Sequence, residues 1–237
     1  MSLDDAALVR EEYATEHGLA ARKAVYSEVT GRDVREIVFA AVAEVDPGSV
    51  LEVGCGEGEL AERLQRELGL GVVAVDQSER MVELTRARGV DARVGDVQHL
   101  PFTDGAFDVV VAAWMLYHVP DLEVALGELA RVLEPGGRLV AVTNAADHLA
   151  EMFELAGLER LVLPFGAENG KAHLGRHFAR VERRDAEGTV MFRDAEQIRS
   201  YLRSSARLRH GADSVPELIE PLVARRRPVV FVAEKAV

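Results

Sequence analysis

The stretch Val50-Leu51-Glu52-Val53-Gly54-Cys55-Gly56-Glu57-Gly58 decides the fold of this 237-residue chain. A short valine-rich run leads into three glycines at alternate positions, and apolar residues then recur at helical spacing, at positions 60, 61, 64 and 68. This order predicts a strand, a glycine-rich turn and a helix. Glycine in such a turn lets the backbone adopt positive φ and lets a ligand lie close to the main chain.

The glycine spacing argues against the dinucleotide fingerprint G-x-G-x-x-G/A. Counted from Gly54 and Gly56, the sixth position is Glu59, a bulky acid where close helix packing needs a small residue. A turn that receives a nucleoside without a pyrophosphate fits better. The sequence also contains no Walker A motif and no G-x-S-x-G motif.

The same nine residues resemble the first motif of class I S-adenosylmethionine (SAM)-dependent methyltransferases, (V/I)-L-(D/E)-x-G-x-G-x-G, at every fixed position. The resemblance implies SAM as the cofactor and S-adenosylhomocysteine (SAH) as its product. It also implies that the turn binds the cofactor, with Glu52, Gly54, Cys55 and Gly56 as the candidate residues. Because no histidine neighbours Cys55 in sequence, we expect a small packing residue there rather than a nucleophile.

A second acidic position follows the next apolar run, residues 71–75. Asp76 lies 22 residues after Gly54, where a carboxylate at a strand end can accept hydrogen bonds from both ribose hydroxyls. The alternative is an N-terminal cap for the following helix, although Ser78 is better placed for that. The segment matches the D-x-S pattern of the methyltransferases, which adds Gln77 and Met81 to the cofactor-binding candidates.

A third short strand is predicted at 91–94, followed by Gly95, Asp96 and Val97. Asp96 could accept a hydrogen bond from the adenine amine while the backbone N–H of Val97 contacts the ring, or it could simply be a turn residue after glycine. The D-x-x-x-L-P-F segment that begins at Asp96 is similar to the branch that includes the ubiquinone and menaquinone biosynthesis C-methyltransferases.

The fourth strand, 107–113, runs into a loop that should line the ligand crevice, because open α/β sheets bind ligands beyond the carboxyl ends of their strands. The resemblance places Ala113 and Trp114 against the cofactor and His118 near the transferred methyl. His118 is therefore the candidate general base, and Tyr117 and His118 are candidate substrate contacts. The alternatives are core packing for Trp114 and Tyr117 and a backbone-bonded histidine for His118.

A helical stripe over 122–133 precedes Pro135-Gly136-Gly137, a turn typical of the family, and a strand at 138–143. Asn144 and His148 follow that strand and are further candidates for substrate contact. The alternative is that Asn144 and Asp147 cap the next helix.

The two ends of the chain are predicted to flank the site. Residues 1–46 read as N-terminal helices, and the resemblance implies a lid whose Tyr13 and Arg22 approach the methionine carboxylate; ordinary surface charges are the alternative. Residues 47–237 would form the SAM-binding domain, with a cap-like insertion at about 149–227. Within it we expect helices at 149–163, 195–204 and 215–226 and strands at 178–184 and 189–192, before a last strand at 228–235.

These elements predict an α/β, three-layer, Rossmann-like fold. Its seven-stranded sheet would be mostly parallel with an antiparallel last strand, and N-terminal helices and a C-terminal helical insertion would be added to it. The resemblance implies methyl transfer to a small-molecule acceptor. A tRNA-nucleoside methyltransferase and a non-catalytic SAM-binding regulatory protein are the alternatives, and the oligomeric state stays open.

Composition limits the partners. The net charge is −12, with −14 on residues 1–150 and +2 on the rest, which argues against a large nucleic-acid footprint. The arginines at 199–209 and 225–227 are the candidates for one. One cysteine, an acidic N-terminus and the lack of a long apolar run predict a cytoplasmic protein without a membrane span. His173 and His177 have zinc-like spacing, but with no third ligand in view we expect no metal.

Overall fold

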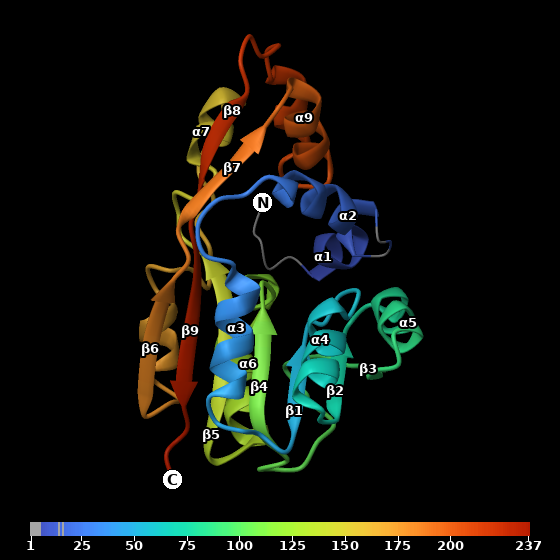
Figure 1. The fold of residues 1–237 in the computed structure, drawn as a ribbon, viewed down its shortest axis with the longest axis vertical. Coiled ribbons are helices and arrows are strands. Elements are labelled where there is room, and N and C mark those ends of the chain that lie inside the picture. The colour runs from blue at the N-terminus through green and yellow to red at the C-terminus, as the bar shows by residue number, and fades with distance from the viewer. Residues whose placement is uncertain (1–5, 14, 16) are drawn as a thin grey trace.

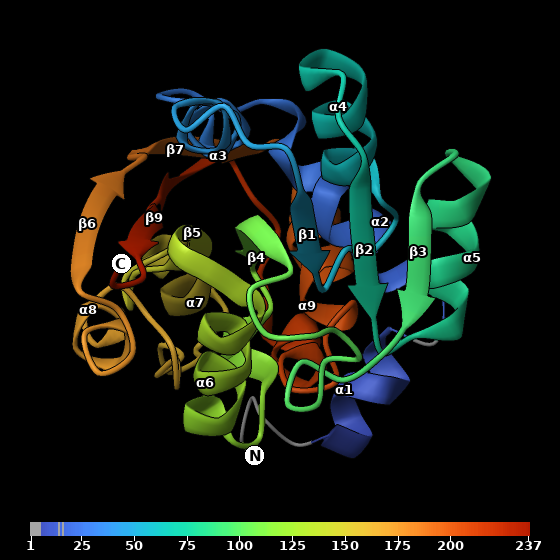
Figure 2. The same ribbon diagram turned by 90° about the horizontal axis from the view of Figure 1, so that it is seen from below.

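The predicted first strand is β1 (Val50–Val53), and it lies within a seven-stranded sheet in the computed structural model, which describes residues 6–13, 15 and 17–237. The strand order is β3-β2-β1-β4-β5-β9-β6 (Figures 1 and 2). The other strands are β2 (Val72–Asp76), β3 (Asp91–Val94), β4 (Phe107–Ala113), β5 (Leu133–Asn144), β6 (Arg180–Asp185) and β9 (Pro228–Glu234). Strands β1 to β5 pair in parallel, and β9 is antiparallel to both β5 and β6. The predicted sheet with its antiparallel last strand is confirmed.

Helices cover both faces of this sheet (Figure 2). One apolar cluster packs α3 (Val34–Ala43), α4 (Glu59–Leu68) and α5 (Glu79–Ala87) on one face, and another packs α6 (Leu122–Val132) and α8 (Gly170–Leu174) on the other. Both faces of the central strands are therefore buried, which is why their sequences are continuous valine-rich runs without polar alternation.

The N-terminal helices α1 (Ala6–Glu12) and α2 (His17–Ala24) lie beyond the carboxyl ends of the strands, with the short helix η1 (Val25–Ser27) after them. An ideal Cβ on Gly56 would lie 3.5 Å from Leu19 Cδ2, so α2 packs directly on the glycine-rich turn. Further along, Thr30 N donates to Thr189 O at 2.9 Å. The N-terminal segment thus contacts both the sheet domain and the insertion (Figure 1).

The insertion forms a cap with its own apolar core at one end of the molecule (Figure 1). It contains α7 (Ala150–Leu155), α9 (Ala195–Arg203), η3 (Arg209–Ser214) and a two-stranded sheet of β7 (Gly188–Phe192) and β8 (Leu222–Arg226). Strand β6, from the same part of the sequence, joins the main sheet instead. The insertion therefore mixes helices and strands.

Of two helices predicted in the cap, one is shorter than expected and the other is wrong. The helix expected over 149–163 ends at Leu155, because Gly157 adopts φ +66°. The segment expected to be helical over 215–226 is a loop followed by strand β8. Pro216 and Pro221 lack the N–H that a helix needs and disfavour helical conformation in the residue before them, and Ala224 alternates as a buried strand residue.

Candidate active site

The strand order reverses between β1 and β4, which are hydrogen-bonded neighbours. Crevices at such switch points, beyond the carboxyl ends of the strands, are where open α/β sheets bind ligands. The glycine-rich turn follows β1 here, and the short helix η2 (Leu116–His118) follows β4. The two segments predicted to hold cofactor and substrate are therefore adjacent.

The glycines of the turn are required by their neighbours. Gly54 has φ +71°, and a Cβ there would lie 2.7 Å from Met115 Cβ, in the loop after β4. Gly58 has φ +75°, and a Cβ there would lie 2.6 Å from Thr85 Cγ2 on α5. Both contacts are closer than real Cβ atoms make, so the turn needs the glycines for packing as well as for backbone conformation.

Asp76 lies beside this turn and is hydrogen-bonded to it. Its Oδ2 accepts from Gly56 N at 2.9 Å, and its Oδ1 accepts from Ser78 N at 2.9 Å. Burial raises the pKa of this carboxyl, although the hydrogen bonds from Ser78 and Gly56 lower it. The backbone N–H of Gln77 also hydrogen-bonds to this carboxyl. A carboxylate offers about four lone-pair positions, so at least one stays open to a ligand. The alternative role as helix cap belongs to Ser78, whose Oγ accepts from Met81 N.

Asp96 lies at the same edge of the sheet. Gly95 N donates to Asp76 O at 3.0 Å, which sets the ends of β2 and β3 side by side. The Asp96 side chain is exposed and accepts from Gln98 N at 2.9 Å, whereas Val97 is buried. Asp96 is thus a turn residue that also lies next to the proposed ribose carboxylate, so its two predicted roles are compatible.

Besides Val97, three of the predicted cofactor-binding residues are buried in the protein: Glu52, Cys55 and Met81. Glu52 is 3% exposed, and its carboxyl accepts from the Ala61 backbone N–H. Its Oε2 has no hydrogen-bond partner among the residues that the structure describes, and burial raises the pKa of this carboxyl to about 8. Burial also raises the pKa of the Cys55 thiol, which lies 3.5 Å from Thr85 Oγ1. Glu52 and Cys55 thus bond to the helices that follow the first two strands, and a neutral buried thiol is a poor nucleophile.

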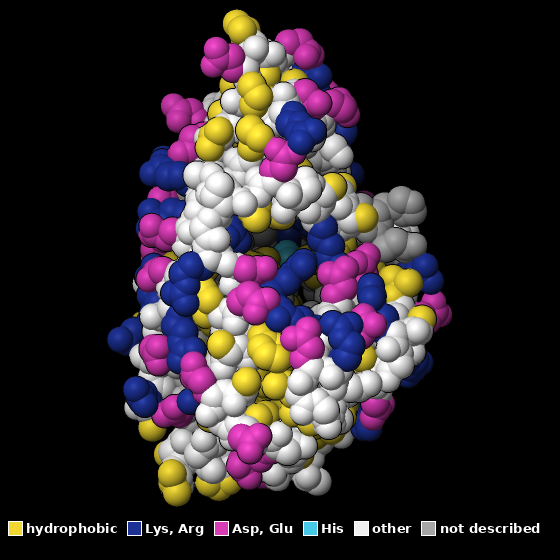
Figure 3. Space-filling model, viewed as in Figure 1, with side chains coloured by type: hydrophobic (Ala, Val, Ile, Leu, Met, Phe, Trp, Pro, Cys, Tyr) yellow, Lys and Arg dark blue, Asp and Glu magenta, His cyan; other side chains and the backbone are white. Residues whose placement is uncertain are grey.

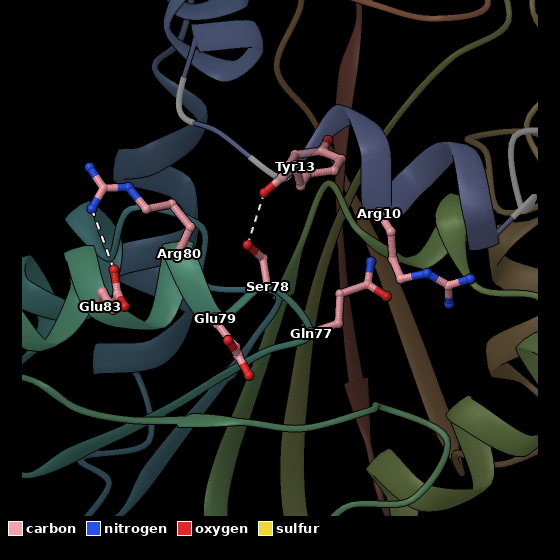
Figure 4. Close-up of a pocket in the computed structure, with 7 residues that line it drawn as sticks. All are labelled: Arg10, Tyr13, Gln77, Ser78, Glu79, Arg80 and Glu83. Carbon is pink, nitrogen blue, oxygen red and sulfur yellow. Dashed lines mark hydrogen bonds and ion pairs between the residues drawn. The ribbon is translucent and has the colours of Figure 1, made fainter.

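A cleft of about 420 Å³ adjoins Gln77 and Ser78 (Figure 4). Its other side is formed by Arg10 and Tyr13 of the N-terminal segment. The Ser78 hydroxyl donates to the Tyr13 backbone carbonyl at 2.8 Å, and this contact joins the N-terminal segment to the end of β2. Gln77 is exposed at this cleft, as a cofactor-contacting residue after Asp76 would be.

Trp114 has φ +55°, a conformation that bulky residues adopt rarely and at a cost in free energy. Its backbone N–H donates to Val142 O at 2.9 Å, and its indole N–H lies 3.4 Å from Asn144 Oδ1. Such strain concentrates at functional sites. The side chain is part-exposed at the end of β4, after Ala113, which agrees with a role beyond core packing.

A second cavity, of about 120 Å³, lies between the sheet, the N-terminal segment and the cap, and a histidine is visible inside the hollow in Figure 3. The four predicted substrate residues all line it: Tyr117, His118, Asn144 and His148. Tyr13 and Arg22 line it from the N-terminal segment. Tyr13 borders both this cavity and the cleft at Gln77, so it forms part of the wall between them.

His118 faces this cavity within a cluster of aromatic rings. Its Nε2 lies 3.3 Å from the Tyr13 hydroxyl, and its ring centroid lies 4.5 Å from that of Tyr117. The Arg22 guanidinium lies over the Tyr13 ring, 5.2 Å from the centroid. His118 is therefore in the cavity wall, bonded to a side chain that also borders the cleft.

His148 lines the cavity, and both of its ring nitrogens bond to the protein. Its Nδ1 accepts from Arg227 N at 2.9 Å, so the neutral ring carries its proton on Nε2, 3.1 Å from the Tyr26 hydroxyl. Burial lowers its pKa to about 3. His148 thus stays neutral and orients Tyr26, which is hydrogen-bonded to Tyr201.

The proposed capping role of Asn144 and Asp147 is wrong. Helix α7 is preceded by Leu149, which has φ +57° and makes no side-chain cap. The Asn144 side chain bonds to Trp114, and Asp147 forms an ion pair with Arg227 at 2.9 Å.

Several further cavity residues were not predicted, among them Glu12, Tyr201 and Arg207. Tyr201 and Arg207 come from the cap, about 85 residues beyond His118 in sequence. The amino-acid composition contains one feature that could have indicated Tyr201. The chain has four tyrosines, at 13, 26, 117 and 201; three of them line this cavity and the fourth is hydrogen-bonded to Tyr201.

Two expected absences concern the part of the chain that the structure describes. Across residues 6–13, 15 and 17–237, no helix is long and apolar enough to cross a membrane. Within the same residues, no group of three His, Cys, Asp or Glu side chains is arranged to hold a metal ion. His173 and His177 instead share the exposed carboxylate of Glu123, with Arg176 on the same group.

Sequence comparisons place this site within a family. Residues 51–141 match the family model described as a methyltransferase domain. The demethylmenaquinone methyltransferase of Thermus thermophilus is 43% identical over 106 residues, which cover 42% of this chain and 48% of that protein. The ubiquinone biosynthesis O-methyltransferase of Xanthomonas oryzae pv. oryzae is 37% identical over 131 residues, 52% of this chain and 54% of that protein. The chain spans about half the length of the curated relatives it matches.

Comparison with solved structures covers more of the chain than the sequence comparisons do. The solved structure of the [4+2]-cyclase SpnF is 21% identical, covers 97% of this chain and 95% of its own, and superposes with a TM-score of 0.64. A similarity at this level of identity shows the fold and leaves the reaction open. Together, the family match, the glycine-rich turn joined to Asp76 and the strand order show that this chain carries a class I SAM-dependent methyltransferase domain.

Proposed function

We propose that the protein transfers a methyl group from SAM to a small-molecule acceptor. The observation that carries this proposal is the shared wall at Tyr13, which borders both the cleft at Gln77 and Ser78, directly after Asp76 in sequence, and the cavity at His118. A cofactor held by its ribose on one side would present its reactive end to an acceptor on the other. Relatives that methylate quinone precursors, by their names, support a small-molecule acceptor.

The residues of the turn fit a nucleoside cofactor. Asp76 keeps at least one accepting position beside its backbone hydrogen bonds, and Gly56 leaves the main chain uncovered by a side chain of its own. We assign the adenine end to Gln77, Asp96 and Val97 and the methionine end to Gly54, Ala113 and Trp114, with Tyr13 and Arg22 above it. When bound, SAM supplies a methyl group that is already activated as an electrophile.

The protein's task is then to position the acceptor and exclude water, and positioning alone contributes effective molarities of roughly 10⁵ to 10⁸ M. The N-terminal segment is anchored as a lid would be. Lys23 forms an ion pair with Glu59 at 3.1 Å and another with Glu57, both next to the turn. Glu12 accepts from Ser205 Oγ and from Ala206 N in the cap.

The ion pairs and hydrogen bonds of the cap arginines argue against the alternative that the substrate is an RNA. Arg199 pairs with Glu217 at 2.8 Å, and Arg225 pairs with Glu151 at 2.6 Å. Arg226 is buried and donates to the Arg32 carbonyl, while Arg227 pairs with Asp147 and Glu187. Arginines neutralised in this way add little to a phosphate-binding surface.

Transfer of tritiated methyl from SAM to fractionated cell extract tests the proposal. We expect label in the low-molecular-weight fraction and none above background in the RNA fraction. Label confined to RNA would replace the proposal with the tRNA alternative. Tight SAH binding in calorimetry with no labelled product in any fraction would instead support a non-catalytic SAM-binding protein.

With an acceptor in hand, His118→Ala should lower kcat on the order of 100-fold, which is the usual contribution of a general base. The Kd for SAM should change by less than about threefold, because His118 lies in the acceptor cavity. Steady-state kinetics and SAH calorimetry separate the two effects. His99→Ala is the matched control, because His99 is exposed outside that cavity. An unchanged kcat for His118→Ala would remove this residue from the mechanism.

A further inference from the structure

Tyr201, on helix α9 of the cap, lines the cavity at His118. Burial raises the pKa of its hydroxyl, and the positive charge of Arg22 lowers it. The hydroxyls of Tyr13 and Tyr117 also interact electrostatically with the hydroxyl of Tyr201. Arg22, Tyr13 and Tyr117 line the same cavity, so the hydroxyl end of Tyr201 lies among the polar groups of its wall.

A row of three hydrogen bonds connects this hydroxyl to the main chain at Arg227. The row begins at the Arg227 backbone N–H, which can only donate and lies 2.9 Å from His148 Nδ1. Because burial lowers its pKa to about 3, the His148 ring is neutral and carries its one proton on Nε2. This nitrogen lies 3.1 Å from the Tyr26 hydroxyl and donates to it. A backbone amide therefore fixes the direction of the first two bonds.

The third bond joins the hydroxyls of Tyr26 and Tyr201. The Tyr26 oxygen already accepts from His148, and among the described residues its hydrogen has no acceptor other than Tyr201. A buried hydroxyl hydrogen without an acceptor is costly, so Tyr26 donates and Tyr201 accepts. Burial raises the pKa of both groups; this bond raises the pKa of Tyr26 further and lowers that of Tyr201, as expected for this direction.

The hydrogen of the Tyr201 hydroxyl is thus left to be donated into the cavity. Within the part of the chain that the structure describes, Tyr26 is the one hydrogen-bond partner of this hydroxyl. Phe153, Leu161 and Leu208 line the cavity too and belong to the same apolar cluster as Tyr201. A ligand that fills the cavity keeps water away from this hydroxyl, so a ligand without an acceptor for the hydrogen binds more weakly.

We propose that Tyr201 binds the methyl acceptor by donating its hydroxyl hydrogen to an oxygen of that molecule. This rests on the proposed function and adds the chemical class of the acceptor to it. The class is a small molecule with an apolar part and an oxygen, separate from the methylated atom, that accepts a hydrogen bond. An N–H group at the same position would face another donor and is disfavoured. Tyr201 is therefore a specificity-determining residue and takes no part in the methyl transfer step.

Transfer of tritiated methyl from SAM to the low-molecular-weight fraction of cell extract tests this, with the fraction as a concentration series. Tyr201→Phe should need about tenfold more of the fraction for its half-maximal rate, because one hydrogen bond to the acceptor is lost. Its maximal rate and its Kd for SAH should stay within about threefold, as for a contact that contributes binding alone. Arg203→Gln is the matched control, because Arg203 is exposed on the same helix. If Tyr201→Phe needs no more of the fraction than wild type, the proposal is wrong.

Tyr26→Phe separates binding of the acceptor from a structural role of the row. Each tyrosine variant leaves one buried donor unpaired: His148 Nε2–H in Tyr26→Phe and the Tyr26 hydroxyl in Tyr201→Phe. Thermal unfolding should therefore show similar losses of stability. Tyr26→Phe keeps the Tyr201 hydroxyl in the cavity wall, so it should raise the half-maximal concentration less than Tyr201→Phe does. An equal or larger rise in Tyr26→Phe would overturn the proposal.

The labelled product provides a check that needs no variant. Its mass spectrum and fragmentation should show at least one oxygen besides the methylated atom, and a product without such an oxygen would overturn the proposal. If the wild-type protein transfers no label to the low-molecular-weight fraction, the result counts against the proposed function instead. The two failures are therefore distinguishable.

Discussion

Asp76→Asn is expected to weaken SAM and SAH binding on the order of 100-fold. Hydrogen bonds to a charged acceptor contribute about 1.5 to 3 kcal/mol each, and every 1.4 kcal/mol is a factor of ten in Kd. The substitution removes the charge and turns one acceptor into a donor. That donor would face either Gly56 N or Ser78 N, which both donate to the carboxylate now, so the turn would also lose a contact.

Isothermal titration calorimetry with SAH measures this effect, and thermal unfolding of the ligand-free variant separates it from a loss of stability. Asp91→Asn is the matched control, because Asp91 lies on the adjacent strand, is exposed and pairs with Arg93 at 2.7 Å. A variant that folds and binds SAH with the wild-type Kd would show that the carboxylate does not hold the ribose. The proposal that Asp76 and the glycine-rich turn bind the same cofactor would then be wrong.

The central sheet could be predicted from sequence because its signals are local. Runs such as 72–76 and 107–113 are apolar on both faces, and short glycine or proline turns separate them from amphipathic helices. The position of Asp76 beside the turn follows from this topology, since neighbouring parallel strands end at the same edge. The positions of Asp76 and the glycine-rich turn could therefore be predicted with little information on long-range contacts.

The acceptor half could not be predicted in the same way. Tyr201 and Arg207 line the cavity from the cap, where the sequence pattern predicts secondary structure only weakly. The helix predicted over 215–226 is wrong because the spacing of its apolar residues suits a helix or a strand. His148 was expected to contact substrate, yet its partners Tyr26 and Arg227 come from opposite ends of the chain. Sequence spacing carries no information about such pairings.

Glu59 both departs from the dinucleotide pattern and contacts the N-terminal segment. In sequence, its bulk at the sixth position of the motif excludes a dinucleotide fingerprint. In the structure, it begins α4 and forms an ion pair with Lys23 of α2. The same side chain that departs from the dinucleotide pattern therefore anchors the N-terminal segment over the turn.

Glu52→Gln is expected to make the protein more stable than wild type at pH 8 and to change the pH dependence of unfolding. Folding raises the pKa of Glu52 from an ordinary value of 4.5 to about 8, because its carboxyl is buried. Below pH 4.5 both states hold the proton. Between pH 4.5 and 8 the unfolded state releases it while the folded state keeps it, so stability falls as pH rises, by at most roughly 1.4 kcal/mol per pH unit.

Glutamine removes this titration and keeps the oxygen that accepts from Ala61 N–H. Urea unfolding at pH 5 and pH 8 should therefore show the variant gaining on wild type by up to about 4 kcal/mol between the two pH values. Other titrating groups change both proteins alike and cancel in this difference. Glu62→Gln, an exposed change on α4 near Arg88, should show no such gain. If Glu52→Gln and wild type keep a constant difference across this range, Glu52 is ionised in the folded protein and its burial must be compensated by a group beside Oε2.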